Sequence, residues 1–524
     1  MNPEIRSLQE MLRQSAAQFG GLPAVRFHGT TTTYAELDAA ADRTAHLLQA
    51  AGVERGGRVG LYCINSPFFA AAYFGIVRAG AVVVPVNLLL SPGEVEYILR
   101  HAEASALIYH EAFEAAVRAV RPAVGSLRAT LSIGAQQGAA DHALLPVMQE
   151  GDRSHVEHPV DLAEDLAVIM YTSGTTGQPK GAMLTHRNLL SNVDSVRAML
   201  EMGPGDTIIT VLPMFHAFAA TACMLTGLRV GAQLAAVPRF LPDELSQVIE
   251  REQGTVFMGV PSMYAVLADL PAERSPDFSH LRLCVSGGAA LPAEVMRRFE
   301  QRYGVPIYEG DGPTECSPVT SINPIGGVRK VGSIGRPVPS VEMRIVDDQG
   351  AQLPVGQVGE IVVRGPNVMK GYWRQPEATA EAFLGEWFRT GDVGHVDQDG
   401  YFYIVDRKKD MIIVNGMNVY PRHVEEVIYQ HPAVAECAVV AEPDTLHGEI
   451  PKAVIAFRAG KSATPSELRR WCLQHLGRYQ VPRIWEVRDQ LPKNATGKIL
   501  KRELTRRGEA ERGIDQDGPA VAGA

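Results

Sequence analysis

A run rich in hydroxyl groups and glycines, residues 171–181, reads Tyr-Thr-Ser-Gly-Thr-Thr-Gly-Gln-Pro-Lys-Gly. Its glycines let the backbone approach a ligand closely and adopt positive φ angles. The hydroxyls, the exposed N–H groups and the charge of Lys180 suit phosphate oxygens. The run therefore predicts a loop that cradles phosphate groups. It is not a Walker A loop, because Gly181 follows Lys180 where that pattern requires Ser or Thr.

Six further segments carry chemically active residues in a fixed order along the chain. They are residues 212–218, 286–292, 309–315, 387–392, 403–410 and 491–499. Together with the 171–181 run, they resemble the motifs of the acyl-adenylate-forming superfamily. That superfamily contains acyl-CoA synthetases, adenylation domains of peptide synthetases and firefly luciferase. The resemblance extends from about Thr33 to Lys498 and implies an ATP-dependent acyl-CoA synthetase. Such an enzyme converts a carboxylic acid, ATP and coenzyme A into acyl-CoA, AMP and pyrophosphate through an acyl-adenylate.

The resemblance implies that ATP is held by several separate parts of the chain. Thr314 is implied to contact phosphate and Glu315 to hold Mg²⁺, a role that suits a hard carboxylate ligand. The other implied nucleotide contacts are Thr172, Ser173, Gly174, Thr175, Thr176, Gly177 and Lys180 in the phosphate loop, Gly287, Gly288 and Ala289 beside the adenine, and Glu309, Gly310 and Asp311 before Thr314.

One of these positions departs from the superfamily's pattern. Where the superfamily commonly has an aromatic residue that packs on adenine, this chain has Asp311. A carboxylate cannot stack on a base. We therefore expect either that another group covers the ring or that nucleotide affinity and base choice differ.

The resemblance also implies a mobile C-terminal part that serves two half-reactions. Asp392 is implied to accept hydrogen bonds from both ribose hydroxyls, which one carboxylate can do at once. Arg407 is implied to contact ribose and phosphate, and Lys409 to be the hinge. Lys498 would enter the adenylation site as a catalytic group. Gly416, on the opposite face, would line the path of the coenzyme A thiol.

Residues 212–218, Leu-Pro-Met-Phe-His-Ala-Phe, resemble the motif beside the carboxylate pocket. There His216 is implied to shape the acyl entrance and to serve catalysis. The small residues Ala217, Ala219, Ala220 and Ala222 and the run 287–290 indicate a roomy apolar pocket. This favours a medium- or long-chain fatty acid, although the same residues suit an aryl or alicyclic acid.

Other functions are compatible with parts of this pattern. An acyl-AMP ligase that loads a carrier protein would differ only in its acceptor. An aminoacyl-adenylating domain usually has an acid near residues 216–218, and the sequence has none there. A non-catalytic nucleotide sensor has only Asp311 in its favour. It is disfavoured by the joint presence of Lys180, Glu315, Asp392, Arg407 and Lys498.

The spacing of apolar runs predicts an α/β fold. The runs 58–63, 81–86, 166–172, 207–211, 255–259 and 281–286 lack polar alternation, which is typical of parallel strands covered on both faces. Helical patterns such as 34–51 and 242–253 lie between them, so we expect layered α/β sheets. Strands at 341–346, 359–363 and 401–405 indicate a small β subdomain.

A charged run at residues 406–410 is unlikely to be buried, and we place a domain boundary there. The N-terminal adenylate-forming domain would span residues 1–408. A small mobile α+β C-terminal domain would span 409–506, with strands at 412–414, 435–440 and 452–457. Residues 507–524, rich in Gly, Ala and charge, are expected to be disordered.

Composition narrows the partners. The 524 residues carry 50 basic and 59 acidic side chains, a net charge of −9 that argues against nucleic acid as a partner. The six cysteines have no CxxC spacing and suit a reducing compartment. Arg78 and Pro85 interrupt the apolar stretch 68–90, so we expect no membrane span. We expect a cytoplasmic protein; peripheral membrane association and the number of subunits, a homodimer included, stay open.

Overall fold

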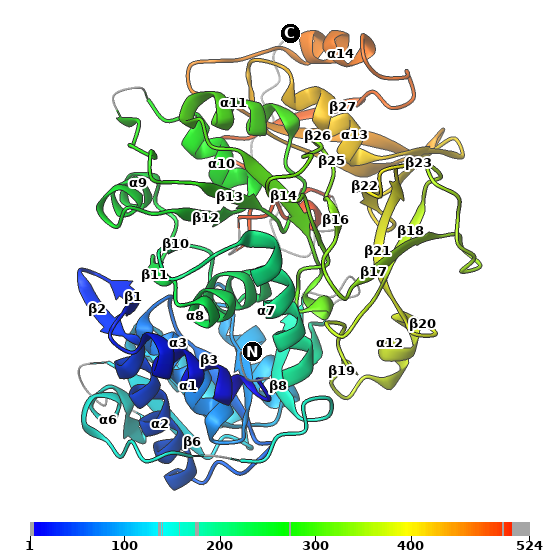
Figure 1. The fold of residues 1–524 in the computed structure, drawn as a ribbon. Coiled ribbons are helices and arrows are strands. Elements are labelled where there is room, and N and C mark those ends of the chain that lie inside the picture. Colours follow the sequence, from blue (N-terminus) through cyan, green and yellow to red (C-terminus); the bar gives the residue numbers. More distant parts are fainter. Residues whose placement is uncertain are drawn as a thin grey trace.

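The computed structural model describes residues 5–134, 138, 140–156, 158–172, 178–271, 274–494 and 497–505 (Figure 1). The predicted disordered tail, 507–524, lies outside the described residues. Two large sheets form the N-terminal body, and helices α7 (His186–Leu200) and α8 (Thr226–Val230) lie between them. The predicted layered α/β architecture is therefore confirmed.

The first sheet has the strand order β19-β9-β8-β4-β3-β5-β6-β7. Its central strands pair in parallel, whereas β9 and β19 add antiparallel at one edge. Their bounds are β3 Arg58–Tyr62, β4 Val82–Pro85, β5 Ala104–His110, β6 Ala129–Ile133, β7 His142–Ala143, β8 Leu166–Thr172, β9 Lys180–Thr185 and β19 Gly371–Tyr372. Because β8 and β9 flank the 171–181 run, this edge positions both ends of the phosphate loop.

The second sheet has the order β16-β15-β14-β13-β12-β10-β11-β1-β2. Strands β10 to β14 and β1 pair in parallel, and their carboxyl ends meet at one edge. Their bounds are β1 Pro23–Phe27, β2 Thr30–Thr33, β10 Thr207–Thr210, β11 Gln233–Ala236, β12 Val256–Gly259, β13 Leu283–Ser286, β14 Ile307–Asp311, β15 Ser321–Ile322 and β16 Arg336–Pro337. Ligands of α/β proteins bind outside such carboxyl ends.

Helices cover both sheets. They are α1 Leu8–Phe19, α2 Tyr34–Ala50, α3 Pro67–Arg78, α4 Pro92–His101, α5 Glu114–Val120, α6 Leu144–Glu150, α9 Pro242–Arg251, α10 Pro261–Ala268, α11 Ala293–Tyr303 and α12 Pro376–Glu381, with the buried π-helical segment η3 Ala219–Leu225 before α8. Several begin with a capping box; in α2 the Thr33 hydroxyl and the Glu36 carboxylate each accept a backbone N–H of the other residue.

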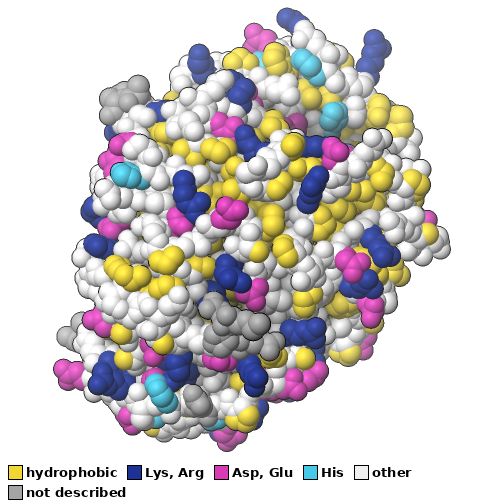
Figure 2. Space-filling model, in the orientation of Figure 1, with side chains coloured by type: hydrophobic (Ala, Val, Ile, Leu, Met, Phe, Trp, Pro, Cys, Tyr) yellow, Lys and Arg dark blue, Asp and Glu magenta, His cyan; other side chains and the backbone are white. Residues whose placement is uncertain are grey.

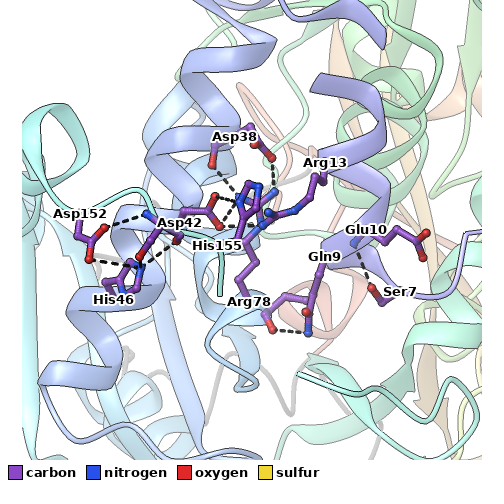
Figure 3. Close-up of polar contacts among 12 residues, drawn as sticks. Ser7, Gln9, Glu10, Arg13, Asp38, Asp42, His46, Arg78, Asp152 and His155 are labelled. Atoms are coloured by element: carbon purple, nitrogen blue, oxygen red, sulfur yellow. Dashed lines mark hydrogen bonds and ion pairs between the residues drawn. The ribbon is translucent and has the colours of Figure 1, made fainter. Parts of the chain in front are cut away.

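A buried arginine ties three of these helices together (Figure 3). Arg78 ends the apolar helix α3 and has no exposed surface. Its guanidinium pairs with Asp38 and lies 2.9 Å from Asp42, both on α2, and Arg13 of α1 also lies 2.9 Å from Asp42. Buried charges need such partners. Arg78, the charged residue that interrupts the apolar stretch 68–90, thus belongs to an internal cluster of ion pairs.

The predicted β subdomain is a separate antiparallel sheet. Its strands are β17 Glu342–Val346, β18 Gly359–Arg364, β20 Phe383–Leu384, β21 Trp387–Val396 and β22 Phe402–Arg407. Strand β21 pairs with β22 so that Asp392 lies opposite Arg407. This register brings together two residues that the sequence assigns to the nucleotide.

The C-terminal part has its own sheet and its own apolar core. The sheet contains β23 Ile412–Val414, β24 Met417–Val419, β25 Val434–Asp444, β26 Gly448–Phe457 and β27 Ile484–Val487, with helices α13 Pro421–Tyr429 and α14 Pro465–Leu473 and the 3₁₀ turn η6 Lys501–Leu504. The second core begins at Ile412. Strands β25 and β26 are longer than the predicted 435–440 and 452–457.

The molecular surface is of mixed charge. On the face in Figure 2, basic and acidic side chains are interspersed. Among the residues described, no helix is both long and apolar enough to span a bilayer.

Candidate active site

A cavity opens beside the carboxyl ends of β12, β13 and β14. Its empty volume, open mouth included, is about 580 Å³. It is lined by Val196, Met199, Leu200, His216, Phe218, Ala222, Met258, Val285, Ser286, Gly287, Gly288, Gly310, Asp311, Gly312, Pro318, Val319, Ile322 and Val338. The structure thus brings three sequence-predicted segments, 212–218, 286–292 and 309–315, around one space.

Residues 212–218 follow β10 and reach the cavity because a buried side chain anchors them. The Asn65 amide accepts a 2.7 Å hydrogen bond from the Met214 N–H and donates a 2.9 Å bond to the Leu212 carbonyl. These bonds satisfy a loop that would otherwise bury unpaired backbone groups. The anchored loop places Phe218 and His216 at the cavity and leads into η3, whose Ala222 forms part of the wall.

His216 is an uncharged imidazole at neutral pH. Its Nδ1 accepts a 3.3 Å hydrogen bond from the Phe218 N–H. Burial, followed by the positive charge of Lys498, lowers its pKa to about 4. With Nδ1 accepting, the proton resides on Nε2, so the ring can donate one hydrogen bond without adding charge to the apolar cavity.

Glycines lie where two strand ends approach neighbouring backbone and rings closely. A Cβ on Gly287 would lie 3.3 Å from the Phe218 ring and 3.4 Å from the Gly310 carbonyl. A Cβ on Gly312 would lie 1.7 Å from the Pro318 carbonyl oxygen, which no side chain tolerates. These glycines keep a narrow slot beside the strand ends, as a flat ring requires. Ala289, also assigned to the nucleotide, follows Gly288 but does not line the cavity.

Two carboxylates, Asp392 and Asp311, and two cations, Arg407 and Lys498, form a cluster beside the cavity. Arg407 Nε lies 3.2 Å from Asp392 Oδ1, and Asp392 is buried while Arg407 is half-exposed. Burial raises the pKa of Asp392 against the effect of Arg407. Burial and the like charge of Asp392 raise the pKa of Asp311, opposed by Arg407 and Lys498. Asp311 therefore belongs to the charged cluster as well as to the cavity lining.

Lys498 is held at this cluster by its own loop. The Lys498 N–H donates to Asn494 Oδ1 at 2.9 Å, and the Gly497 N–H donates to the Asn494 carbonyl at 2.9 Å. The Ser262 hydroxyl, on α10 of the N-terminal body, donates to the Gly497 carbonyl at 3.0 Å. Burial, followed by Arg407, lowers the pKa of Lys498 to about 8. The lysine is thus charged at neutral pH.

Glu315 and Lys180 lie around one tyrosine. The Tyr372 hydroxyl donates a 2.9 Å hydrogen bond to Glu315 Oε1, and the Lys180 ammonium lies 5.1 Å from the Tyr372 ring centre. Thr172 and Lys180 mark the two ends of the phosphate loop on β8 and β9. Ser173, Gly174, Thr175, Thr176 and Gly177, predicted to cradle phosphates, lie outside the described residues. Thr314 precedes Glu315 in a 3₁₀ turn.

Glu309 is placed differently from the other predicted nucleotide residues. Its carboxylate is buried and does not line the cavity. Oε1 accepts a 3.0 Å hydrogen bond from the Leu291 N–H and lies 3.9 Å from the Arg422 guanidinium, whereas Oε2 is buried without a partner among the described residues. Burial raises its pKa to about 7. Its side chain thus ties the backbone at Leu291 to β14.

The implied hinge and thiol-path residues lie in turns. Lys409 stands in the turn between β22 and β23, where burial lowers its pKa. Gly416 has a φ of +78° at the tip of the β23–β24 hairpin, next to Asn415, and is exposed. Neither lines the cavity in this arrangement.

Sequence reasoning missed Tyr372 and Ser262. Each acts through a partner far away in the chain, so no local motif announces it. The one available signal was the aromatic pair at residues 372–373, after a glycine near the end of the N-terminal body.

The model of the AMP-binding enzyme family matches residues 12–373, and that of the AMP-binding enzyme C-terminal domain matches residues 423–498. The chain belongs to the AMP-binding enzyme family. A long-chain-fatty-acid–CoA ligase of Bacillus subtilis is 37% identical over 527 residues, covering 95% of this chain and 94% of that protein. A feruloyl-CoA synthase of an Amycolatopsis species is 40% identical over 485 residues, covering 92% and 95%.

A comparison with solved structures gives the same family of enzymes as these sequence relatives. The anthranilate CoA ligase AuaEII, in complex with anthranoyl-AMP, is similar with a TM-score of 0.88 and 30% identity, covering 96% of this chain and 97% of that one. The predicted class, an AMP-forming acyl-CoA ligase that works through an acyl-adenylate, is confirmed. The relatives' names span a long-chain fatty acid, ferulate and anthranilate, so the acid must be argued from the cavity.

The residues around Glu315 suit a Mg²⁺ ion that binds together with ATP. Within the described part of the chain, no group of three or more His, Cys, Asp or Glu side chains is arranged to hold a metal. Magnesium usually binds through one or two carboxylates together with substrate phosphates and water. A single carboxylate such as Glu315, with one oxygen held by Tyr372, matches that mode.

Proposed function

We propose that this AMP-forming ligase activates a medium- or long-chain fatty acid and transfers it to coenzyme A. The observation that carries the proposal is the lining of the cavity. Ten of its eighteen lining residues are aliphatic, one is Phe218, and only His216, Ser286 and Asp311 bear polar side chains. Such a lining binds hydrocarbon by excluding water, at about 0.8 kcal/mol per buried methylene.

In the first half-reaction the substrate carboxylate attacks the α-phosphorus of ATP, and pyrophosphate leaves. The Lys498 ammonium, set beside Asp311 and Asp392, stabilises the negative charge that gathers on the α-phosphate. Asp392 accepts the ribose hydroxyls, and Arg407, fixed to Asp392, contacts ribose and phosphate. These groups act by position and charge rather than by covalent chemistry.

The remaining phosphate contacts come from the loop edge of the first sheet. Lys180 and the residues 172–177 hold the leaving phosphates, and Thr314 adds a hydroxyl. Glu315 would hold Mg²⁺ when ATP is bound, and the cation would offset negative charge on the phosphates. His216 is uncharged and carries its proton on Nε2. It can therefore donate a hydrogen bond to a carboxylate oxygen at the acyl entrance without placing a charge beside the apolar chain.

In the second half-reaction the coenzyme A thiol attacks the acyl carbon, and AMP leaves. We assign the domains as residues 1–408 and 409–506, with Lys409 as the hinge. Rotation of the second domain withdraws Lys498 and brings the Gly416 hairpin to the thiol's path. The contact of Ser262 with Gly497 would break in that step. The arrangement described here suits the first half-reaction.

We also propose a cytoplasmic location. All six cysteines are buried and free of disulfides, which suits a reducing compartment. The small-molecule partners that we propose are coenzyme A, ATP and the carboxylic acid substrate.

Mass-spectrometric detection of acyl-CoA, with ATP, Mg²⁺ and coenzyme A, tests the proposal. The acids would run from acetate through C8 to C18 fatty acids to benzoate, ferulate and cyclohexanecarboxylate. A product with C8 or longer fatty acids supports the proposal. A product with ferulate or benzoate alone would assign an aryl acid instead. Acyl-AMP and pyrophosphate without thioester would point to a carrier protein as acceptor.

A further inference from the structure

Tyr372 contacts the two oppositely charged groups of the phosphate site at once. Its hydroxyl donates to Glu315 Oε1 at 2.9 Å, and its ring centre lies 5.1 Å from Lys180 Nζ. Tyr372 is buried, with 9% of the residue's surface exposed. A cation over an aromatic ring and a carboxylate on its hydroxyl are both favourable contacts.

The backbone fixes this side chain in place. Strand β19 pairs antiparallel with β9, setting Tyr372 opposite Ala182 and Gly371 opposite Met183. The Trp373 N–H donates to the Gly181 carbonyl at 2.8 Å, one residue beyond Lys180. Just before this strand, the Met369 N–H donates to the Glu315 carbonyl at 2.7 Å. The short segment thus joins the strand of Lys180 to the turn of Glu315.

Lys180 and Glu315 have a strong reason to pair directly. A carboxylate and an ammonium that approach within 4 Å attract one another, and the pair would occupy the groups meant for phosphate and magnesium. No ion pair of Lys180 or Glu315 with another described residue is present, and Glu315 Oε2 has no partner among the same residues. Tyr372 instead contacts both charged groups.

We propose that Tyr372 is a positioning residue that holds Glu315 and Lys180 apart and preset for magnesium and phosphate. Its hydroxyl fixes one oxygen of Glu315 and leaves the other for the cation. Its ring keeps the Lys180 ammonium on the phosphate side and out of reach of the carboxylate. This inference rests on the proposed roles of Glu315 and Lys180.

Two substitutions separate the hydroxyl from the ring. Tyr372→Phe removes the hydrogen bond to Glu315 and keeps the ring under Lys180. Tyr372→Leu removes both contacts and lets Glu315 and Lys180 pair. Tyr303→Phe is the matched control, because the Tyr303 hydroxyl makes one 2.8 Å bond to the Leu267 carbonyl and Tyr303 does not line the cavity.

The readout is ATP binding by isothermal titration calorimetry at a series of Mg²⁺ concentrations, with the full-length protein and no acid. We expect Tyr372→Phe to raise the half-saturating Mg²⁺ concentration about 10-fold, as loss of an outer-shell partner of a metal ligand commonly does. ATP affinity at saturating Mg²⁺ should change less than about 3-fold in Tyr372→Phe but fall further in Tyr372→Leu, by about 10-fold.

An unchanged Mg²⁺ dependence in Tyr372→Phe, with wild-type melting temperature, would overturn the proposal. Equal effects of Tyr372→Phe and Tyr303→Phe would do the same, since they would show a general loss of stability. The measurement needs no turnover. If the wild-type protein binds ATP in a Mg²⁺-dependent manner but yields no acyl-AMP, the proposed function is refuted. The role of Tyr372 is still tested in that case.

Discussion

Asp392 and Arg407 face each other across the β21–β22 pair, and the Arg407 Nε lies 3.2 Å from the Asp392 carboxylate. The pairing joins β22, the last strand before the predicted hinge Lys409, to Asp392, which the sequence assigns to the ribose. Lys498 and Asp311 lie close enough to this pair to shift its titration. One cluster of charges therefore joins the β subdomain, the end of β14 and the C-terminal part of the chain.

Loss of the Lys498 ammonium should stop the first half-reaction selectively. Lys498→Ala should lower acyl-AMP formation about 10²-fold or more, as removal of a transition-state donor does. Thioester formation from pre-made acyl-AMP should be largely spared. Pyrophosphate release and thioester yield measure the two steps. The control is Lys493→Ala, because Lys493 lies on the same loop as Lys498 and pairs with Glu436. Equal losses in both half-reactions would contradict the assigned role.

The rate of acyl-AMP formation should fall at alkaline pH. Because the pKa of Lys498 is lowered to about 8, the ammonium predominates below that pH and is lost as the pH rises through it. Above pH 8 we expect a decline that approaches about 10-fold per pH unit. Lys498→Arg should show no such decline up to pH 10, because a guanidinium keeps its charge. Pyrophosphate release without coenzyme A, measured from pH 6 to 10, gives both profiles. The same decline in Lys498→Arg would assign the titration to another group.

The candidate site residues could be named from the sequence because they sit in short motifs. Lys498, Glu315 and Asp392 each follow a turn signature, and the structure places Asp392 and Lys498 in one cluster. Contacts such as Ser262 with Gly497 could not be predicted, since they join residues 235 positions apart. Only tertiary packing creates them.

The apolar strands of the fold were predictable, whereas the full length of β26 was not. Strand β26 begins at Gly448 and includes Pro451, which lies opposite Ala441 of β25. Proline normally argues against an interior strand position, and the predicted strand began at 452, one residue beyond Pro451. Here its carbonyl accepts the Arg483 N–H at 3.0 Å, so Pro451 still takes part in the backbone pairing.

Adding an aromatic ring at residue 311 should strengthen ATP binding. Asp311 lines the cavity beside Gly310 and Gly312, where the superfamily commonly stacks a ring on adenine. Asp311→Tyr should lower the ATP dissociation constant about 3- to 10-fold, the equivalent of about 0.5–1.5 kcal/mol for an aromatic pair. Asp311→Asn, which removes the charge without adding a ring, should change it less. Calorimetry with Mg²⁺-ATP measures both. Weaker binding in both variants would mean that the carboxylate itself holds the nucleotide.

Removing the charge of Glu309 should stabilise the protein at alkaline pH. Burial raises the pKa of Glu309 from 4.5 to about 7. Between these pH values the folded chain therefore binds more protons than the unfolded chain. Its stability therefore falls as the pH rises from 4.5 to 7 and changes no further above. Relative to wild type, Glu309→Gln should gain about 3 kcal/mol in unfolding free energy between pH 4.5 and pH 8. Urea denaturation at both pH values measures the gain, and Glu381→Gln, at the exposed end of α12, should gain nothing. A pH-independent difference for Glu309→Gln would mean that the carboxylate stays charged in the fold.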